Sequence, residues 1–147
     1  MTTIAWDGKT VSADSRATVG GDRIYQAKAQ KIIKVKFGVV ATCGALNHRF
    51  FEFAAWADKG ARGGHFYTKS DDTDYIFFSN IDHTVYIFGK DWRDHSEEPM
   101  FATGSGGKFA LAAMLAGAKS KKAVEIACKL DPFSGGEVVS FPWKRKV

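Results

Sequence analysis

The first 43 residues of the chain are dominated by short β-prone runs of apolar and β-branched residues. These runs predict strands at 2–6, 10–14, 22–26 and 31–43, with a break in the last run at Gly38. Asp7 and Gly8 lie between the first two runs, and an Asp-Gly pair in that position favours a tight hairpin turn. The N-terminal region is therefore expected to form β-hairpins.

The spacing of apolar residues changes after residue 43. Apolar residues now recur at helical intervals and predict an amphipathic helix across about residues 45–59, the recurring positions being Leu46, Phe50, Phe53, Ala54 and Ala57. Gly60 supplies a plausible stop for this helix. Two more helices are expected, one rich in small residues over about 108–117 and one over about 121–130 with Ser120 as its N-cap.

A polar, glycine-rich segment separates the first helix from the later strands. Residues 60–74 are expected to form a surface loop because glycine and polar residues dominate them. The other elements are expected at 75–81 and 84–90 as a hairpin around Asp82 and His83, at 91–99 as a charged loop, and at 100–103 and 137–141 as strands.

The order of these elements predicts the fold class. Strands cluster in runs instead of alternating one by one with helices, which disfavours a parallel doubly wound sheet. An α+β layered fold with mainly antiparallel sheets fits the order better. The chain has 147 residues, no internal repeat and no long linker, so a single domain over 1–147 is expected.

Composition excludes several classes of protein. Hydrophobic residues make up 45% and charged residues 25%, as in an ordinary globular protein. The apolar stretches are too short to cross a membrane, and residues 1–9 do not have the pattern of a signal peptide. A cytoplasmic location without membrane attachment is expected, and the two cysteines, Cys43 and Cys128, fit a reduced compartment.

The net charge of +5 does not by itself indicate a nucleic-acid partner. Lysine and arginine are spread along the chain, and Lys144-Arg145-Lys146 is their only dense run, so a solvated basic surface is the simpler interpretation. The cysteines form no CxxC motif and the four histidines lack metal-ligand spacing. We therefore expect no nucleic-acid partner, no metal and no cofactor.

The N-terminus carries the most specific chemical signal. Removal of Met1, which is usual before a small residue, would expose Thr2 with a free α-amine that titrates near pH ~8. One residue would then supply both a nucleophilic hydroxyl and its general base. Alone this signal is weak, because an edge strand with β-branched residues is the favoured explanation of Thr2 and Thr3 when no other residues support a catalytic role.

Segments along most of the chain strengthen the signal at the N-terminus. ADSRAT (13–18), KIIKV (31–35), GSGG (104–107) before an alanine-rich helix, and DPFSGG (131–136) occur in this order. Each is weak alone: Gly104–Gly107 could be an ordinary flexible turn, and Asp14 and Lys31 an ordinary surface ion pair. Together they resemble the proteasome β subunits and HslV, which are N-terminal nucleophile hydrolases of the threonine peptidase type.

The resemblance implies an αββα sandwich and a role for each matching residue. Thr2 would be the nucleophile, Lys31 would lower the pKa of its hydroxyl, and Asp14 would orient Lys31. The remaining implied residues are Ser105, Asp131 and Ser134 around the α-amine, the backbone N–H of Gly44 or Ala45 as oxyanion hole, and Ala17, Ile33 and Cys43 lining a pocket for an uncharged side chain.

The chain also departs from the family pattern. Its N-terminal hairpin is shorter, and one residue is inserted between Asp14 and Lys31. Residues 60–74 cannot supply the second long helix that relatives have after the first, so one helical layer should be reduced. Exposed aromatic residues on the remaining helix, namely Phe50, Phe51, Phe53 and Trp56, would then mark an interface. The chain therefore resembles a shortened phage or bacterial relative.

The resemblance further implies partners. A homo-oligomeric ring would act as a threonine endopeptidase on peptides or unfolded proteins, and an ATPase unfoldase could deliver them, although this chain has no phosphate-binding Gly-x-x-x-x-Gly-Lys motif. Two other hypotheses stay open at this point. The chain could be a catalytically silent ring or phage structural protein, or an amidase of the same fold acting on small amides.

Overall fold

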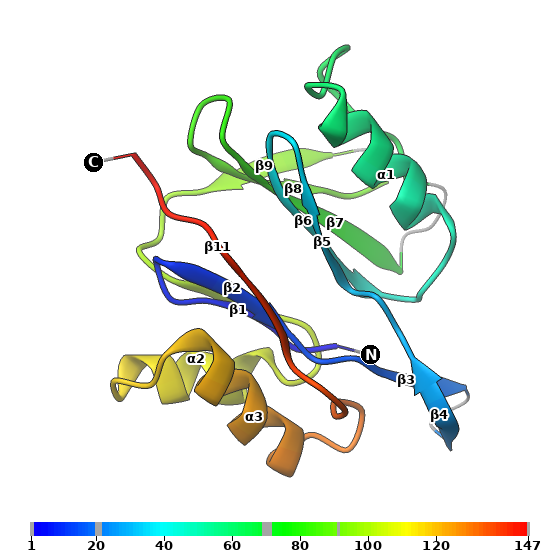
Figure 1. The fold of residues 1–147 in the computed structure, drawn as a ribbon, viewed down its shortest axis with the longest axis vertical. Coiled ribbons are helices and arrows are strands. Elements are labelled where there is room, and N and C mark those ends of the chain that lie inside the picture. Colours follow the sequence, from blue (N-terminus) through cyan, green and yellow to red (C-terminus); the bar gives the residue numbers. More distant parts are fainter. Residues whose placement is uncertain (1, 20–21, 69–71, 91, 147) are drawn as a thin grey trace.

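Two antiparallel sheets pack face to face, and helices cover the outer face of each (Figure 1). The computed structural model describes residues 2–19, 22–68, 72–90 and 92–146. The predicted α+β class and αββα order of layers are confirmed.

The first sheet contains the N-terminal strand in its interior. Its strands lie in the order β10-β1-β2-β11, with bounds Phe101–Thr103, Ile4–Trp6, Thr10–Ala13 and Val139–Pro142. Ile4 is paired with Thr103 on one side and with Ala13 on the other. Helices α2 (Gly107–Leu115) and α3 (Ser120–Leu130) cover this sheet (Figure 1).

The second sheet is covered by a single helix, α1 (Arg49–Asp58) (Figure 1). Its strands lie in the order β5-β6-β7-β8-β9, with bounds Ile32–Val35, Gly38–Gly44, Thr73–Ser79, Val85–Phe88 and Arg93–Ser96. A separate hairpin of β3 (Arg16–Val19) and β4 (Asp22–Lys28) projects from the side of the molecule (Figure 1). Within the described ranges, no helix has both the length and the hydrophobicity needed to cross a bilayer.

The layering follows from strands that are apolar on both faces. Successive residues of a strand point to opposite sides of its sheet. In β1, Ile4 and Trp6 point between the two sheets, while Ala5 packs against α2 and α3. In β7, Phe78 points between the sheets and Phe77 lies in the cluster beneath α1. Each sheet is therefore buried on both sides, which requires an outer helical layer.

The structure differs from the sequence-based prediction at several places outside the site, one of which is β3, where no strand was predicted. The charged segment 91–99 contains β9, an edge strand whose ladder with β8 does not depend on apolar side chains. Ser120 is not an N-cap but the first residue of α3. Its N–H donates to Asp7 Oδ2 at 2.8 Å, so a carboxylate from the β1–β2 turn satisfies the start of the helix.

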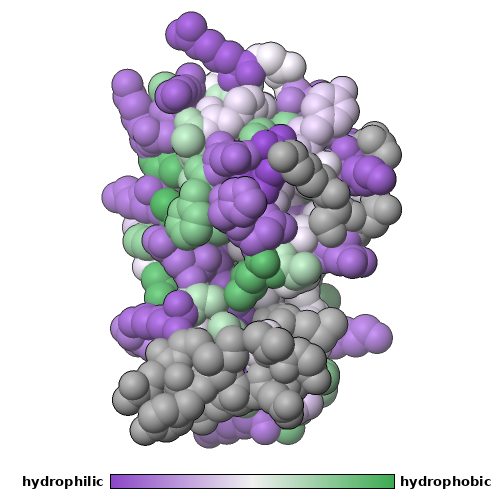
Figure 2. Space-filling view, turned by 90° about the vertical axis from the view of Figure 1, so that its right-hand side faces the viewer, coloured by the Kyte–Doolittle hydropathy of each residue, from purple (hydrophilic) through white to green (hydrophobic). Residues whose placement is uncertain are grey.

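Aromatic residues fill the space beneath the reduced helical layer. Phe50 and Phe53 are buried against Phe66 and Tyr75, so the prediction that they are exposed is wrong, while Phe51 is 53% exposed. The loop after α1 thus supplies Phe66 in place of a second helix. Figure 2 looks onto the side that carries α1, where hydrophobic residues form small patches between hydrophilic ones.

Phe53→Ala tests how much this aromatic cluster contributes to the stability of the fold. Phe53 is fully buried, so we expect the free energy of unfolding to fall by about 3–5 kcal/mol. Phe51→Ala, two positions earlier on the same helix, is the control and should cost less than about 1 kcal/mol. Urea denaturation followed by circular dichroism measures both. Equal losses for the two variants would contradict the assignment of Phe53 to the core.

Candidate active site at the N-terminus

Thr2 and Thr3 are buried and lie directly before β1. Because β1 is flanked by β10 and β2, the backbone of this segment is held from both sides. The turn after β10 carries Ser105, and β2 leads directly into Asp14. The topology of the first sheet therefore brings two predicted site residues to the N-terminus.

The Asp14 carboxylate is the centre of one polar network. It is almost fully buried and accepts the Thr3 N–H at 2.9 Å and the Lys31 ammonium at 2.9 and 3.0 Å. The Gly135 N–H adds a bond at 3.0 Å and the Arg16 N–H one at 3.3 Å. One carboxylate thus joins the N-terminal strand, the β4–β5 connection and the loop after α3.

Lys31 is a buried lysine whose positive charge is stabilised by the Asp14 carboxylate. Burial lowers the pKa of Lys31, and the attraction of Asp14 only partly opposes this effect. Its ammonium group is therefore more acidic than that of an exposed lysine. The ion pair has no exposed side-chain surface, so the alternative of an ordinary surface pair is wrong.

A second network surrounds Asp131. Ser105 Oγ and Ser134 Oγ each donate to Asp131 Oδ2 at 2.6 Å, and the hydroxyls of Ser134 and Thr3 are 2.7 Å apart. Burial alone would raise the pKa of Asp131, but the hydrogen bonds from Ser105, Ser134 and the Phe133 N–H together lower it. The carboxylate is therefore ionised and faces the N-terminal residues through two hydroxyl groups.

Glycine is required in the turn that carries Ser105. Gly104 has φ +91°, and a Cβ there would lie 2.0 Å from the Thr2 carbonyl oxygen. A Cβ on Gly106 would lie 1.9 Å from Thr3 Oγ1. The backbone of the GSGG segment thus lies against Thr2 and Thr3, a close approach that requires glycine and that an ordinary flexible turn does not explain.

The two amides predicted for the oxyanion hole are not equivalent. The Ala45 N–H donates to the Asp72 carbonyl at 3.0 Å and is already used. The Thr42 N–H donates to the Lys31 carbonyl, and alternation along the strand directs the Gly44 N–H to that same side. Of the two backbone amides, the Gly44 N–H is therefore the one directed toward the side of β6 on which Lys31 lies.

A cavity of about 290 Å³ opens beside Thr2. Its lining comes from both sheets and comprises Thr2, Cys43, Gly44, Asp72, Asp74, Thr103, Gly104 and Ser105. Among the described residues, none forms a hydrogen bond with the buried Thr2 hydroxyl. Burial raises the pKa of the Cys43 thiol to about 11, so this neighbour stays protonated and does not compete as a nucleophile.

Sequence reasoning recovered part of this cavity. Of the residues predicted to line a pocket for an uncharged side chain, Cys43 lines this cavity beside Thr2, whereas Ile33 packs against the aromatic cluster beneath α1 and Ala17 lies half-buried in β3. The predicted pocket of these three residues stays a prediction. Asp72 and Asp74 were missed. Asp74 reaches the site because β7 pairs with β6 and places Asp74 opposite Cys43, and Asp72 lies just before the first residue of β7.

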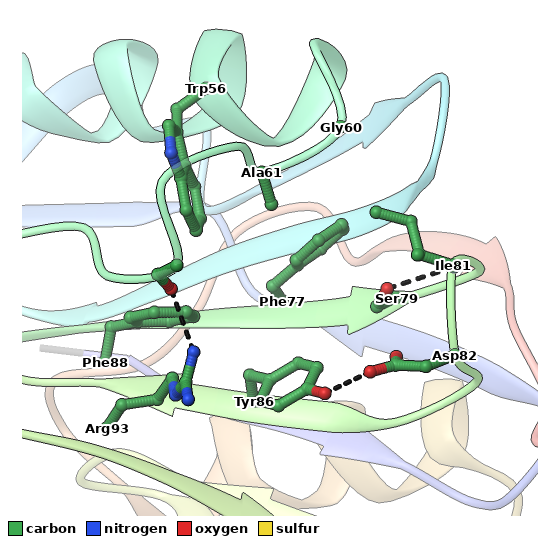
Figure 3. A pocket seen from close by; sticks show the side chains of 11 residues that line it. Trp56, Gly60, Ala61, Phe77, Ser79, Ile81, Asp82, Tyr86, Phe88 and Arg93 are labelled. Atoms are coloured by element: carbon green, nitrogen blue, oxygen red, sulfur yellow. Dashed lines mark hydrogen bonds between the residues drawn. The ribbon is translucent and has the colours of Figure 1, made fainter.

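Another cavity, of about 170 Å³, lies beside the C-terminal end of α1 (Figure 3). Trp56, Phe77, Tyr86 and Phe88 line it with aromatic rings, and Arg93 donates to the Gly64 carbonyl at 2.9 Å. It exists because one helix leaves part of the β7–β8 face uncovered. It holds none of the predicted catalytic residues.

Among the described residues no group of three or more His, Cys, Asp or Glu side chains could hold a metal ion.

Solved structures share this fold. No family model matches the chain, and no curated protein matches it in sequence. Thiobacillus denitrificans BPH is 21% identical with a TM-score of 0.68, covering 99% of this chain and 98% of that chain. BPH in complex with epoxomicin is 23% identical with a TM-score of 0.68 and 99% coverage of both chains. HslV from Trypanosoma brucei is 20% identical with a TM-score of 0.65, covering 98% of this chain and 99% of that chain. The fold implied by the family resemblance is confirmed over nearly the whole chain.

Gly104→Ala tests the close approach of the turn to Thr2. An alanine at positive φ costs about 1–2 kcal/mol of stability, and the clash with the Thr2 carbonyl should add at least about 1 kcal/mol. Gly117→Ala is the matched control, because Gly117 has φ +108° and a Cβ there would meet nothing within 4 Å. Urea denaturation of the two variants measures the difference. Equal destabilisation would show that the turn does not contact the N-terminal strand.

Proposed function

We propose that the chain is a threonine-type endopeptidase in which Thr2 is the nucleophile after removal of Met1. The proposal rests on one observation: two polar networks, around Asp14 and Asp131, hold the N-terminal segment in place by hydrogen bonds. Asp14, itself bound to Lys31, accepts the Thr3 N–H, and the network of Asp131 reaches Thr3 through Ser134. An ordinary edge strand has no need of two buried carboxylates around its first residues.

The proposed reaction begins with attack of the Thr2 hydroxyl on a peptide carbonyl. The hydroxyl proton passes to the neutral α-amine of Thr2, and the negative charge on the carbonyl oxygen is bound by the Gly44 N–H. Collapse of the tetrahedral intermediate breaks the C–N bond, and the protonated α-amine returns its proton to the leaving amine. An ester of Thr2 remains.

Water then resolves this ester. The α-amine, neutral again, takes a proton from the attacking water, and breakdown of the second intermediate returns the proton to the Thr2 oxygen. In this scheme Lys31 places positive charge beside the hydroxyl and favours its ionisation. Ser105, Asp131 and Ser134 orient the α-amine by hydrogen bonds.

We further propose that the active form is a homo-oligomeric ring acting on peptides or unfolded proteins, with an ATPase unfoldase as a partner that delivers them. Exposed apolar side chains available for contacts between subunits include Phe51, Leu115 and Leu130, which are 53%, 70% and 58% exposed. An oligomer would bury these side chains. A monomer that hydrolyses only small amides would instead favour the amidase alternative.

Thr2 should form a covalent adduct only when its amine is free. We expect a protein prepared to begin at Thr2 to gain the full mass of a peptide β-lactone or epoxyketone, because ring opening releases no leaving group. A preparation that keeps Met1 should gain nothing. Intact mass spectrometry followed by peptide mapping measures the adduct and locates it.

Variants at the same position sharpen this test. Thr2→Ala should abolish the adduct, whereas Thr2→Ser keeps a hydroxyl and should still react. A free Thr2 that gains no adduct and cleaves no peptide would favour the catalytically silent alternative. Modification that persists in Thr2→Ala would place the nucleophile elsewhere.

Lys31→Ala should lower kcat/KM for peptide hydrolysis by about 10²–10⁴-fold, because the charge beside the hydroxyl is lost. Lys28→Ala is the control, since Lys28 is exposed and pairs with Glu137 on the surface. Circular dichroism of both variants checks that the fold persists. Near-normal turnover by folded Lys31→Ala would remove Lys31 from the mechanism.

A further inference from the structure

We infer that the cavity beside Thr2 selects a basic residue on the leaving-group side of the scissile bond, with Asp74 as the residue that determines this preference. The inference rests on the proposed function, because it needs a peptide bond placed at Thr2. It goes further by naming the class of sequence that the site cleaves. A Lys or Arg side chain would occupy the cavity.

The direction of the substrate follows from the route of the proton. The leaving amine must receive its proton from the α-amine of Thr2, which is expected to lie among Ser105, Asp131 and Ser134. Ser105 lines the cavity together with Thr2 and Thr103. The cavity that includes Ser105 is therefore on the leaving-group side.

The acyl side is a different surface. A groove of about 250 Å³ is lined by Ala29, Gln30, Thr42, Leu46, Asn47, Phe50 and Phe51. Thr42 and Cys43 are consecutive in β6 and point to opposite faces of the sheet, so this groove and the cavity beside Thr2 lie on opposite sides of the strand end. The groove has no charged side chain in its lining and suits an apolar residue before the cut.

The charged side chains in the cavity lining are both acidic. Asp72 and Asp74 line it, although the chain as a whole carries a net charge of +5. Among the described residues, none forms a hydrogen bond or an ion pair with the Asp74 carboxylate, and burial raises its pKa. A partly buried carboxylate in this state is stabilised by a cation that enters the cavity.

The acidic residues are not the only sign of a ligand. Thr2 is fully buried, lines the same cavity, and has a hydroxyl without a hydrogen-bond partner among the described residues. Asp74 and Cys43 are paired across β6 and β7, and Cys43 Sγ lies 3.9 Å from Thr103 Oγ1 on the opposite sheet. Asp74 is therefore fixed on the cavity wall that faces Thr2 and Thr103.

The test uses internally quenched peptides that differ only in the residue after the scissile bond. With the protein that begins at Thr2, a peptide with Lys there should show a kcat/KM about tenfold above that with norleucine, as expected for one charge-assisted hydrogen bond, and a peptide with Glu should be the poorest. Asp74→Asn should bring the Lys-to-norleucine ratio of kcat/KM close to one, and the ratio is the readout because it does not depend on the overall activity of the variant. Asp94→Asn removes an exposed carboxylate from β9 and should keep the ratio of the wild type.

The outcomes separate this inference from the proposed function. Adduct formation and hydrolysis without preference for Lys in the wild type would overturn the inference alone. Loss of the preference in Asp94→Asn as well as in Asp74→Asn would also overturn it, because general surface charge would then explain the effect. No adduct and no hydrolysis of any peptide would overturn both proposals. If Asp74→Asn does not fold, the wild-type ranking of Lys, norleucine and Glu decides the question.

Discussion

The buried ion pair of Asp14 and Lys31 is the interaction on which the arrangement of the N-terminus depends. Burying either charge alone would cost a large desolvation free energy. The pair offsets this cost because each charge attracts the other and further donors surround it. The Asp14 carboxylate has acceptor capacity left for the Thr3 N–H and the Gly135 N–H. Three segments far apart in the sequence are thus fixed around one anion, and the position of Thr2 follows from theirs.

Much of the fold could be predicted because it depends on local pattern. Strand and helix periodicity predicted most elements and the α+β class, and the αββα layers followed from the family resemblance. The polar residues of the site occur in short motifs that can be recognised without coordinates. The features that sequence reasoning missed depend on pairing between distant segments. Asp7 satisfies the start of α3 across the first sheet, and Asp74 reaches the cavity only through the β6–β7 register. Nothing local to either aspartate indicates its partner.

In the reduced helical layer, large aromatic side chains fill the space that a second helix would occupy. Phe53 packs edge-on against Phe66 and Phe88 and stacks on Tyr75, with ring centroids 5.1–5.6 Å apart. Large rings bury much area per residue, so a short helix and one aromatic residue from a loop close this face of the sheet. The strands of the second sheet lie in the order β5-β6-β7-β8-β9, and Gly44 at the end of β6 lies beside the N-terminal segment.

The pairing of the N-terminal strand sets the order in which the site can form during synthesis. β1 precedes the other strands in this sequence, yet Ile4 pairs with Thr103, and Thr3 bonds to Ser134 across a sequence separation of 131 residues. Contacts between residues so far apart in the sequence form late, after the chain between them has been made. The Asp131 network is therefore complete only when the C-terminal part of the chain is present. A partly synthesised chain that holds Thr2 but not residues 131–134 would lack the Asp131 network, so the proposed active site could not assemble before that segment is made.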